Sequence, residues 1–142
     1  MEIRPLTFEA YDSIIVIWQR ADLSFRIEGR DSRKMMRREF ENNPDLIIGA
    51  FEKGELVGVI IGTDDGRKGW INRLAVEPNF RRKGVAKELI SALEEALKKR
   101  GRRIFCTLVE DWNKASLSLF KNAGYLKHED IFYLSKRENE DV

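Results

Sequence analysis

The segment from Val76 to Ala86 limits the possible folds most, because it joins an apparent strand to an amphipathic helix through a basic turn. Pro78 ends the strand, since proline donates no hydrogen bond to a strand ladder. The turn carries three cations and a glycine, Arg81, Arg82, Lys83 and Gly84. N–H groups at the start of the next helix have no intrahelical partners, and the helix dipole adds positive charge there. A glycine also lets the backbone approach an anion closely. The turn therefore predicts a site for a pyrophosphate-bearing ligand.

The helix after this turn has the clearest periodicity in the sequence. Apolar residues recur at helical spacing from Val85 to Leu97, and Gly101 ends the pattern. Upstream, the patterns predict helices capped by Thr7 and Ser32, and strands over Glu2–Arg4, Leu46–Glu52, Glu55–Gly62 and Gly69–Glu77. Downstream, they predict a short helix over Lys114–Ala123 and strands over Arg103–Val109, Tyr125–Lys127 and Ile131–Leu134.

This order of elements predicts an α+β fold, in which a mixed, mostly antiparallel twisted sheet of six to seven strands is flanked by about four helices. No linker or repeat divides the chain, so we expect a single domain over residues 1–142 with a charged tail from about Lys136. A Rossmann fold fits poorly, because two helices and then three consecutive strands open the chain instead of alternating. The sequence also has no G-x-x-x-x-G-K-[ST] loop.

The composition excludes several classes of protein. Hydrophobic residues make up 42% and charged residues 35% of the chain, as in a folded globular protein. The net charge is only +2, so we expect no nucleic-acid partner. A single cysteine and a single histidine exclude an internal disulfide and an ordinary zinc site, and we expect no metal and a cytoplasmic location. No apolar run approaches the roughly 18 residues of a membrane span, so no membrane association is expected.

Two motifs resemble those of a known family. The segment Leu74-Ala75-Val76-Glu77-Pro78, followed by Arg81-x-x-Gly84-x-Ala86, is similar to the acetyl-CoA signature of the GNAT superfamily of N-acetyltransferases. Asn113, Ser116 and the pair Gly124-Tyr125 resemble the second signature of that family. Their placement relative to the predicted strands and helices is what makes the motifs specific. The resemblance covers nearly the whole chain and is strongest to small bacterial and archaeal members of undefined substrate.

The resemblance implies that acetyl-CoA is the cosubstrate. Backbone groups of Leu74, Ala75 and Val76 would pair with its pantetheine arm, and an N–H near Val76 would stabilise the oxyanion of acyl transfer. The pyrophosphate would be held by the N–H groups of Arg81, Arg82, Lys83, Gly84, Val85 and Ala86. Asn113, Ser116 and Phe120 would complete the cofactor site. Two alternatives stay open: the three cations form only a solvated loop, and Asn113 serves only as a helix N-cap.

The catalytic groups are less well defined. The family often has a tyrosine acid seven residues after the Asn, where this chain has Phe120, which has no proton to donate. Three explanations remain: another donor such as Tyr125, Tyr133 or water serves, the thiolate leaves without a dedicated acid, or the protein binds acetyl-CoA without catalysis. Glu110 and Asp111 are the candidate bases, since they lie where a strand ends near the expected site, and a polar strand end is the alternative. Glu77 is expected to face solvent.

Recognition of the acceptor is expected in and beside the irregular segment between the first two helices. The candidate residues there are Trp18, Phe25, Arg26 and Arg30. We expect Arg26 or Arg30 to pair with a carboxylate or other anion of the acceptor. The alternative is that these arginines pair with Glu28 and Asp31.

The function that we favour is transfer of acetyl from acetyl-CoA to a primary amine of a small molecule or a protein N-terminus, by direct attack in a ternary complex. The alternative, a non-catalytic acetyl-CoA-binding regulatory module, is favoured by Phe120. The last predicted strand offers an edge for a homodimer, with Phe132, Tyr133 and Leu134 as its apolar contacts.

Overall fold

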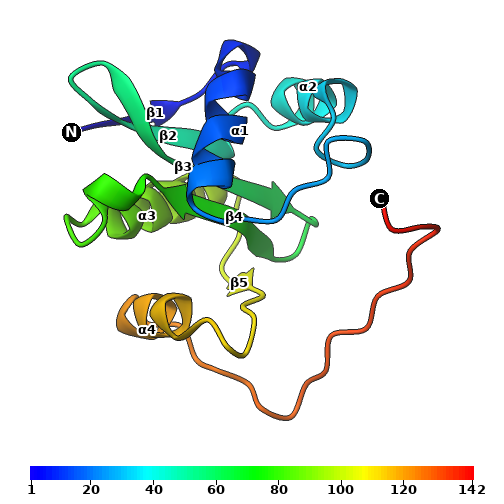
Figure 1. Ribbon diagram of the computed structural model, residues 1–142. Coiled ribbons are helices and arrows are strands. Elements are labelled where there is room, and N and C mark those ends of the chain that lie inside the picture. Colours follow the sequence, from blue (N-terminus) through cyan, green and yellow to red (C-terminus); the bar gives the residue numbers. More distant parts are fainter.

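A five-stranded sheet organises the protein, whose computed structural model describes residues 1–142 (Figure 1). The strands are β1 (Glu2–Pro5), β2 (Ile47–Glu52), β3 (Glu55–Asp64), β4 (Gly69–Val76) and β5 (Phe105–Thr107). They lie side by side in chain order. The β1–β2, β2–β3 and β3–β4 pairs are antiparallel, whereas β4 and β5 are parallel, so the sheet is mixed.

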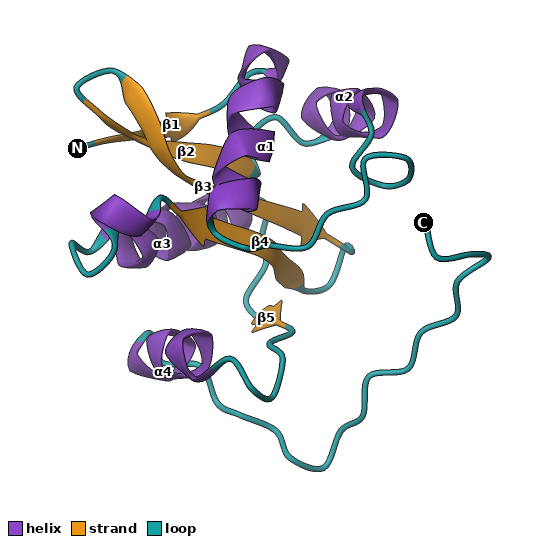
Figure 2. Ribbon diagram, in the orientation of Figure 1, coloured by secondary structure: helices purple, strands orange, loops and turns teal.

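Helices cover both faces of this sheet and divide the apolar interior into two clusters (Figure 2). On one face, α1 (Tyr11–Arg20) and α2 (Arg33–Asn42) join a cluster that includes Ala75 of β4. On the other face, α3 (Val85–Lys99) joins the second cluster, to which α4 (Lys114–Asn122) contributes Phe120. Two short 3-10 turns, η1 (Phe8–Ala10) and η2 (Pro78–Phe80), precede α1 and the basic turn. The predictions of an α+β fold and of about four helices are confirmed.

Local sequence patterns explain most of the helices. The buried residues of α3 recur every three or four positions, as predicted; they are Val85, Leu89, Ile90, Leu93 and Leu97. Ser32 caps α2 as predicted, accepting a hydrogen bond from the Met35 N–H at 3.2 Å. The expected Thr7 cap is wrong, because the Thr7 carbonyl instead closes the 3-10 turn and its side chain bonds no helical N–H. No helix of the protein combines the length and the apolar surface needed to cross a membrane.

The C-terminal part of the chain differs from the prediction. β5 covers only Phe105–Thr107 rather than Arg103–Val109, and neither Tyr125–Lys127 nor Ile131–Leu134 is a strand, so the expected six to seven strands are five. A strand needs a neighbouring backbone for its hydrogen bonds. The chain after α4 instead runs away from β5 as an extended loop (Figure 2). Residues 131–134 are therefore 68–89% exposed.

Candidate functional site

β4 and β5 separate halfway along β4. β5 pairs only with Gly69–Ile71, and β4 continues to Val76 with only β3 beside it. Within that stretch Leu74–Val76 pair with Gly58–Ile60, so the backbone groups that point away from β3 have no strand partner. The side chains of these three residues belong to the apolar clusters on the two faces. The edge of β4 along this stretch therefore offers free backbone groups, and an extended ligand with amide groups can pair with it as an added strand would.

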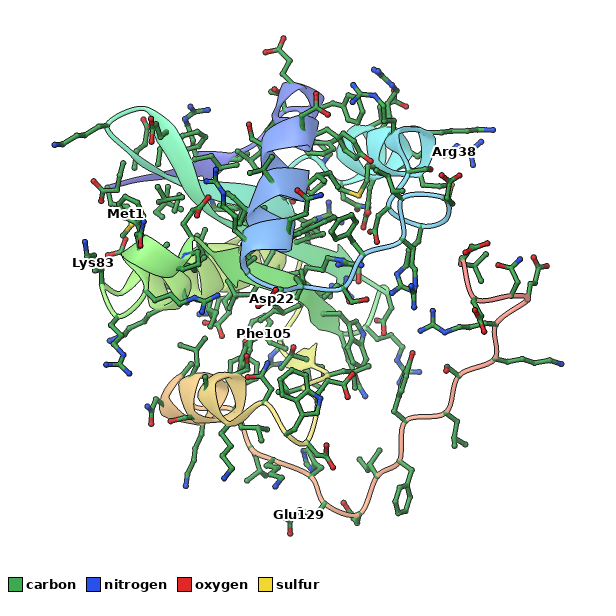
Figure 3. The ribbon with its side chains drawn as sticks, viewed as in Figure 1. Met1, Asp22, Arg38, Lys83, Phe105 and Glu129 are labelled. Atoms are coloured by element: carbon green, nitrogen blue, oxygen red, sulfur yellow. The ribbon has the colours of Figure 1, made fainter.

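The basic turn follows directly from this stretch. Arg81, Arg82 and Lys83 are exposed, and none of them forms an ion pair with a carboxylate. Lys83 lies at the outer edge of the molecule, with its Nζ 5.2 Å from the centroid of the Phe80 ring (Figure 3). The three cations therefore keep their charge available to an anion from solution.

Gly84 opens the start of α3 to that anion. Its φ of +81° lies in the left-handed region, which is strained for any residue with a Cβ. Because Gly84 is the N-cap, no side chain caps the helix. The first intrahelical bond runs from the Glu88 N–H to the Gly84 carbonyl at 3.1 Å, which leaves the N–H groups before it open. An open helix N-terminus beside three free cations fits phosphate groups.

The start of α4 is ordered by its own cap. The Asn113 side chain accepts a hydrogen bond from the Ser116 N–H at 3.1 Å, so the N-cap role is observed. Ser116 is half-buried. Phe120 is buried, and its ring meets the Tyr125 ring edge-to-face with centroids 5.1 Å apart. The structure thus places Phe120 inside the α3-side cluster rather than at an exposed surface.

The three candidate catalytic residues lie in different surroundings. Tyr125 donates a hydrogen bond from its hydroxyl to Oε2 of Glu94 on α3 at 2.6 Å. Burial, together with this carboxylate, raises the pKa of Tyr125 far above its ordinary value, so the hydroxyl keeps its proton. Glu110 and Asp111 are exposed in the turn after β5, and no side-chain hydrogen bond involves either of them. The protein has no group of three His, Cys, Asp or Glu side chains arranged to hold a metal ion.

The α1–α2 connection (residues 21–32) brings the predicted acceptor residues together. Trp18 is fully buried beneath it, and Phe25 packs on Trp18 with ring centroids 6.1 Å apart. Arg26 and Arg30 are exposed on its surface. Nη1 of Arg30 lies 3.5 Å from the main-chain oxygen of Val142. Of the residues predicted to contact the acceptor, Phe25, Arg26 and Arg30 therefore lie at the surface, and the buried Trp18 packs beneath Phe25.

Arg73 of β4 and Glu77, which directly follows β4, form ion pairs that the sequence did not predict. Asp31 pairs with Arg73 of β4, Oδ2 to Nη2 at 2.8 Å, rather than with the nearby Arg26 or Arg30 side chains. The feature of the sequence that could have identified Arg73 is its position as a cation directly before the apolar strand segment Leu74–Val76. Glu77, expected in solvent, has its side chain only 13% exposed and pairs with Arg20 at 2.8 Å.

Comparison with known proteins agrees with this geometry. The chain matches the acetyltransferase (GNAT) family over residues 12–125. It is 34% identical over 141 residues to an acetyltransferase of Sodalis glossinidius, a match that covers 99% of this chain and 98% of that protein.

Solved structures share the fold. The PaiA N-acetyltransferase of Thermoplasma acidophilum, crystallised with coenzyme A, superposes with a TM-score of 0.73 at 23% identity, covering 86% of this chain and 87% of that one. AAC(6')-Iy in complex with the bisubstrate analogue CoA-S-monomethyl-acetylneamine superposes with a TM-score of 0.78 at 19% identity, covering 96% and 97%. The family match and the Sodalis relative show that this chain belongs to the acetyltransferase (GNAT) family.

Proposed function

We propose that the protein transfers acetyl from acetyl-CoA to a primary amine, by direct attack in a ternary complex. The observation that carries this proposal is the edge of Leu74–Val76 that faces away from β3, which has no strand partner and leads into an open helix N-terminus with three free cations. A relative at 34% identity that is named an acetyltransferase supports catalysis over a purely regulatory binding module.

In this proposal, acetyl-CoA lies along the free edge of β4 and the start of α3. Backbone groups of Leu74, Ala75 and Val76 pair with the pantetheine amides, which need an extended partner of this kind. The pyrophosphate lies at the N-terminus of α3, where it meets the N–H groups and side chains of Arg81, Arg82, Lys83, Gly84, Val85 and Ala86. Asn113 and Ser116 border the pantetheine from the start of α4, and Phe120 packs behind them.

The chemistry is a single acyl transfer. The amine nitrogen attacks the thioester carbonyl carbon, the C–N bond forms, and the C–S bond breaks to release the CoA thiolate. The backbone N–H of Val76 stabilises the charge that develops on the carbonyl oxygen. Glu110 or Asp111 takes the proton of the amine, directly or through water. Because Phe120 has no acidic proton and the Tyr125 hydroxyl is bonded to Glu94, the leaving thiolate takes its proton from solvent, which balances the proton that the amine gives up.

The acceptor binds on the α1–α2 connection and carries an anionic group. Arg30 and Arg137 both donate to the main-chain oxygen of Val142 in the C-terminal tail, at 3.5 and 2.7 Å, so two guanidinium groups gather at one acceptor atom. A pocket of about 380 Å³ opens between Arg30 and this tail. An amine with a carboxylate fits such a surface, because a guanidinium binds a carboxylate with directed hydrogen bonds. Among the structural neighbours, AAC(6')-Iy is an enzyme crystallised with an aminoglycoside-derived analogue, which makes small-molecule amines the first class to test.

Thermal unfolding with acetyl-CoA, and with ATP and NAD as controls, tests the cosubstrate. Ligand at about 100 times its Kd stabilises by roughly 2.7 kcal/mol, which raises Tm by several degrees. Release of CoA thiol with a panel of amines then tests transfer, with the panel split into amines that carry a carboxylate and their amides. Binding of acetyl-CoA without transfer to any amine would support the regulatory module instead, and no specific shift in Tm would refute the cosubstrate itself.

We also propose that the protein forms a homodimer through the segment Ile131–Leu134. Its apolar side chains have no partner in the chain, although their exposure to water is unfavourable. Sedimentation of the wild-type protein and of Phe132→Asp tests this contact. We expect the variant to be monomeric, and Leu126→Asp, which lies outside the segment, to behave as the wild type. A wild-type protein that is monomeric at high micromolar concentration would refute the dimer.

A further inference from the structure

Two charged residues flank the stretch Leu74–Val76, and each reaches across to the α1 side of the sheet. Arg73 precedes the stretch and pairs with Asp31 in the α1–α2 connection, with Nη2 and Oδ2 2.8 Å apart. Glu77 follows the stretch and pairs with Arg20 at the end of α1, with Oε1 and Nη1 2.8 Å apart. Both ion pairs therefore join the stretch proposed to hold pantetheine to the elements proposed to hold the acceptor.

The Arg73 pair is the more constrained of the two. The side chains of Arg73 and Asp31 are 13% and 5% exposed, whereas that of Arg20 is 62% exposed. The guanidinium lies over the ring of Trp18, 4.5 Å from its centroid, and Nη1 also donates to the Ser24 carbonyl at 2.6 Å. Because Ser24 and Asp31 are the two ends of the segment 24–31, one arginine holds both ends.

Asp31 also forms hydrogen bonds that hold the main chain of the same segment. Its Oδ2 also accepts a hydrogen bond from the Arg26 N–H at 2.6 Å, and the Tyr11 hydroxyl donates to its carbonyl at 2.6 Å. The N–H of Asp31 in turn donates to the Arg26 carbonyl at 2.9 Å. The charge pair and these backbone bonds form one network, so removal of either charged group affects the whole segment.

Stability alone does not account for a buried ion pair at this place. Burial lowers the pKa of Arg73, and burial together with Asp31 raises the pKa of the nearby Glu39, so the charged forms of Arg73 and Glu39 are disfavoured here. An apolar pair of similar volume is often as stable as a buried ion pair or more stable. The ion pair supplies one defined geometry, because the planar guanidinium fixes the directions of its hydrogen bonds.

We propose that Arg73 is a positioning residue for the acetyl acceptor, which together with Asp31 fixes the α1–α2 connection against β4 directly before the cofactor stretch. This role rests on the proposed function, since Phe25, Arg26 and Arg30 of that connection bind the acceptor. Without the pair, these residues lose their fixed distance from Leu74–Val76. The basic turn and the backbone of the stretch are not altered, so acceptor binding weakens while CoA binding does not.

Arg73→Lys and Asp31→Asn test this role, and Arg100→Lys is the matched control. Arg100 is also an arginine in a part-buried ion network, with its Nε 2.9 Å from Oδ2 of Asp45, but it lies at the far end of α3. The first readout is amide hydrogen exchange of residues 24–31 in the full-length protein, which requires no acceptor. We expect exchange about tenfold faster in the two test variants and unchanged in the control. The Kd for CoA should stay within about twofold of wild type in all three.

The second readout is steady-state kinetics with an amine that the wild type acetylates. We expect the KM for this amine to rise about tenfold in Arg73→Lys, with kcat and the KM for acetyl-CoA nearly unchanged. Unchanged exchange in both test variants, an unchanged acceptor KM, or an equal loss of CoA affinity would each overturn the proposal. A wild-type protein that binds CoA but acetylates no amine would overturn the proposed function and, with it, the acceptor role. Faster exchange in the variants would then show that the Arg73 contacts do order residues 24–31 and that only the proposed function is wrong.

Discussion

Gly84→Ala separates two properties of this residue, its backbone conformation and the access that it gives to phosphates. A Cβ placed on Gly84 meets no atom within 4 Å, so the substitution adds no clash to the free protein. Its effect on stability therefore comes from the φ of +81° alone. A residue with a Cβ is destabilised by about 1–2 kcal/mol in this region. For a chain of this length, that lowers Tm by roughly 3–8 °C.

Gly101→Ala is the matched control for the same helix. Gly101 lies just beyond the C-terminal end of α3, with a φ of +91° and again no atom within 4 Å of an added Cβ. We expect both variants to lose the same stability, because the backbone strain is the same. In the proposed site, only the Cβ at position 84 would occupy the space in which a phosphate approaches the N–H groups of α3. CoA affinity should therefore fall about tenfold in Gly84→Ala, which equals about 1.4 kcal/mol, and stay unchanged in Gly101→Ala.

Circular dichroism melts and calorimetric titration with CoA measure the two effects separately. Gly84→Asn adds a useful third variant, since asparagine tolerates the left-handed region but still carries a Cβ. It should lose less stability than Gly84→Ala and as much CoA affinity. Equal CoA affinity in Gly84→Ala and Gly101→Ala would refute the assignment of Gly84 to the phosphate site. A much larger loss of stability at position 84 would refute the claim that only backbone strain acts there.

Three further perturbations test other parts of the site and fold. Tyr125→Phe should lower stability by about 1.5–3 kcal/mol through loss of the bond to Glu94, and leave kcat within about tenfold of wild type; a fall of 10²–10⁴ would show that Tyr125 is a general acid. Arg82→Ala should weaken CoA binding most at low salt, because salt screens exposed charges, and Arg38→Ala on α2 is its control; equal effects would refute the basic site. Asp65 accepts bonds from the Lys68 N–H, the Trp70 indole and the Arg67 N–H, which lower its pKa from 3.8 to about 2. Its stabilisation is therefore complete above its ordinary pKa and lost as the pH falls through about 2. The difference in Tm between wild type and Asp65→Asn should shrink over that range, and a constant difference would contradict the reasoning.

Elements whose determinants lie within one short segment were predictable from the sequence. α3 carries its own apolar stripe through Leu89, Leu93 and Leu97, and Ser32 lies directly before the N–H groups that it caps. The basic turn was predictable for the same reason, since cations, glycine and helix start are adjacent in the chain. The pairing of Leu74–Val76 with β3 followed from the predicted antiparallel order of strands.

Features that depend on distant partners were not predictable in this way. Asp31 and Arg73 are 42 positions apart, and nothing in either local pattern indicates that they meet. The segment Ile131–Leu134 has the residue types of a strand but no neighbouring backbone, so it remains extended and exposed. A high strand propensity means that a residue fits a pleated sheet, but a segment forms a strand only where a neighbouring strand is present. The sequence likewise indicated Tyr125 as a free proton donor, because nothing in the local pattern shows that Glu94, 31 positions away, accepts a bond from its hydroxyl.

The gap beside Leu74–Val76 is itself an argument for a ligand. Unpaired strand edges favour aggregation, and proteins usually shorten, charge or cover them. This edge is inside the sheet rather than at its border, because β5 lies on the same side of β4 and pairs with its first three residues. Extending that pairing would satisfy more backbone groups, yet β5 ends at Thr107 and the chain turns away at Glu110–Asn113. Because the pairing stops beside an open helix N-terminus and three free cations, an extended, phosphate-bearing molecule could bond both to the free edge of β4 and to the start of α3.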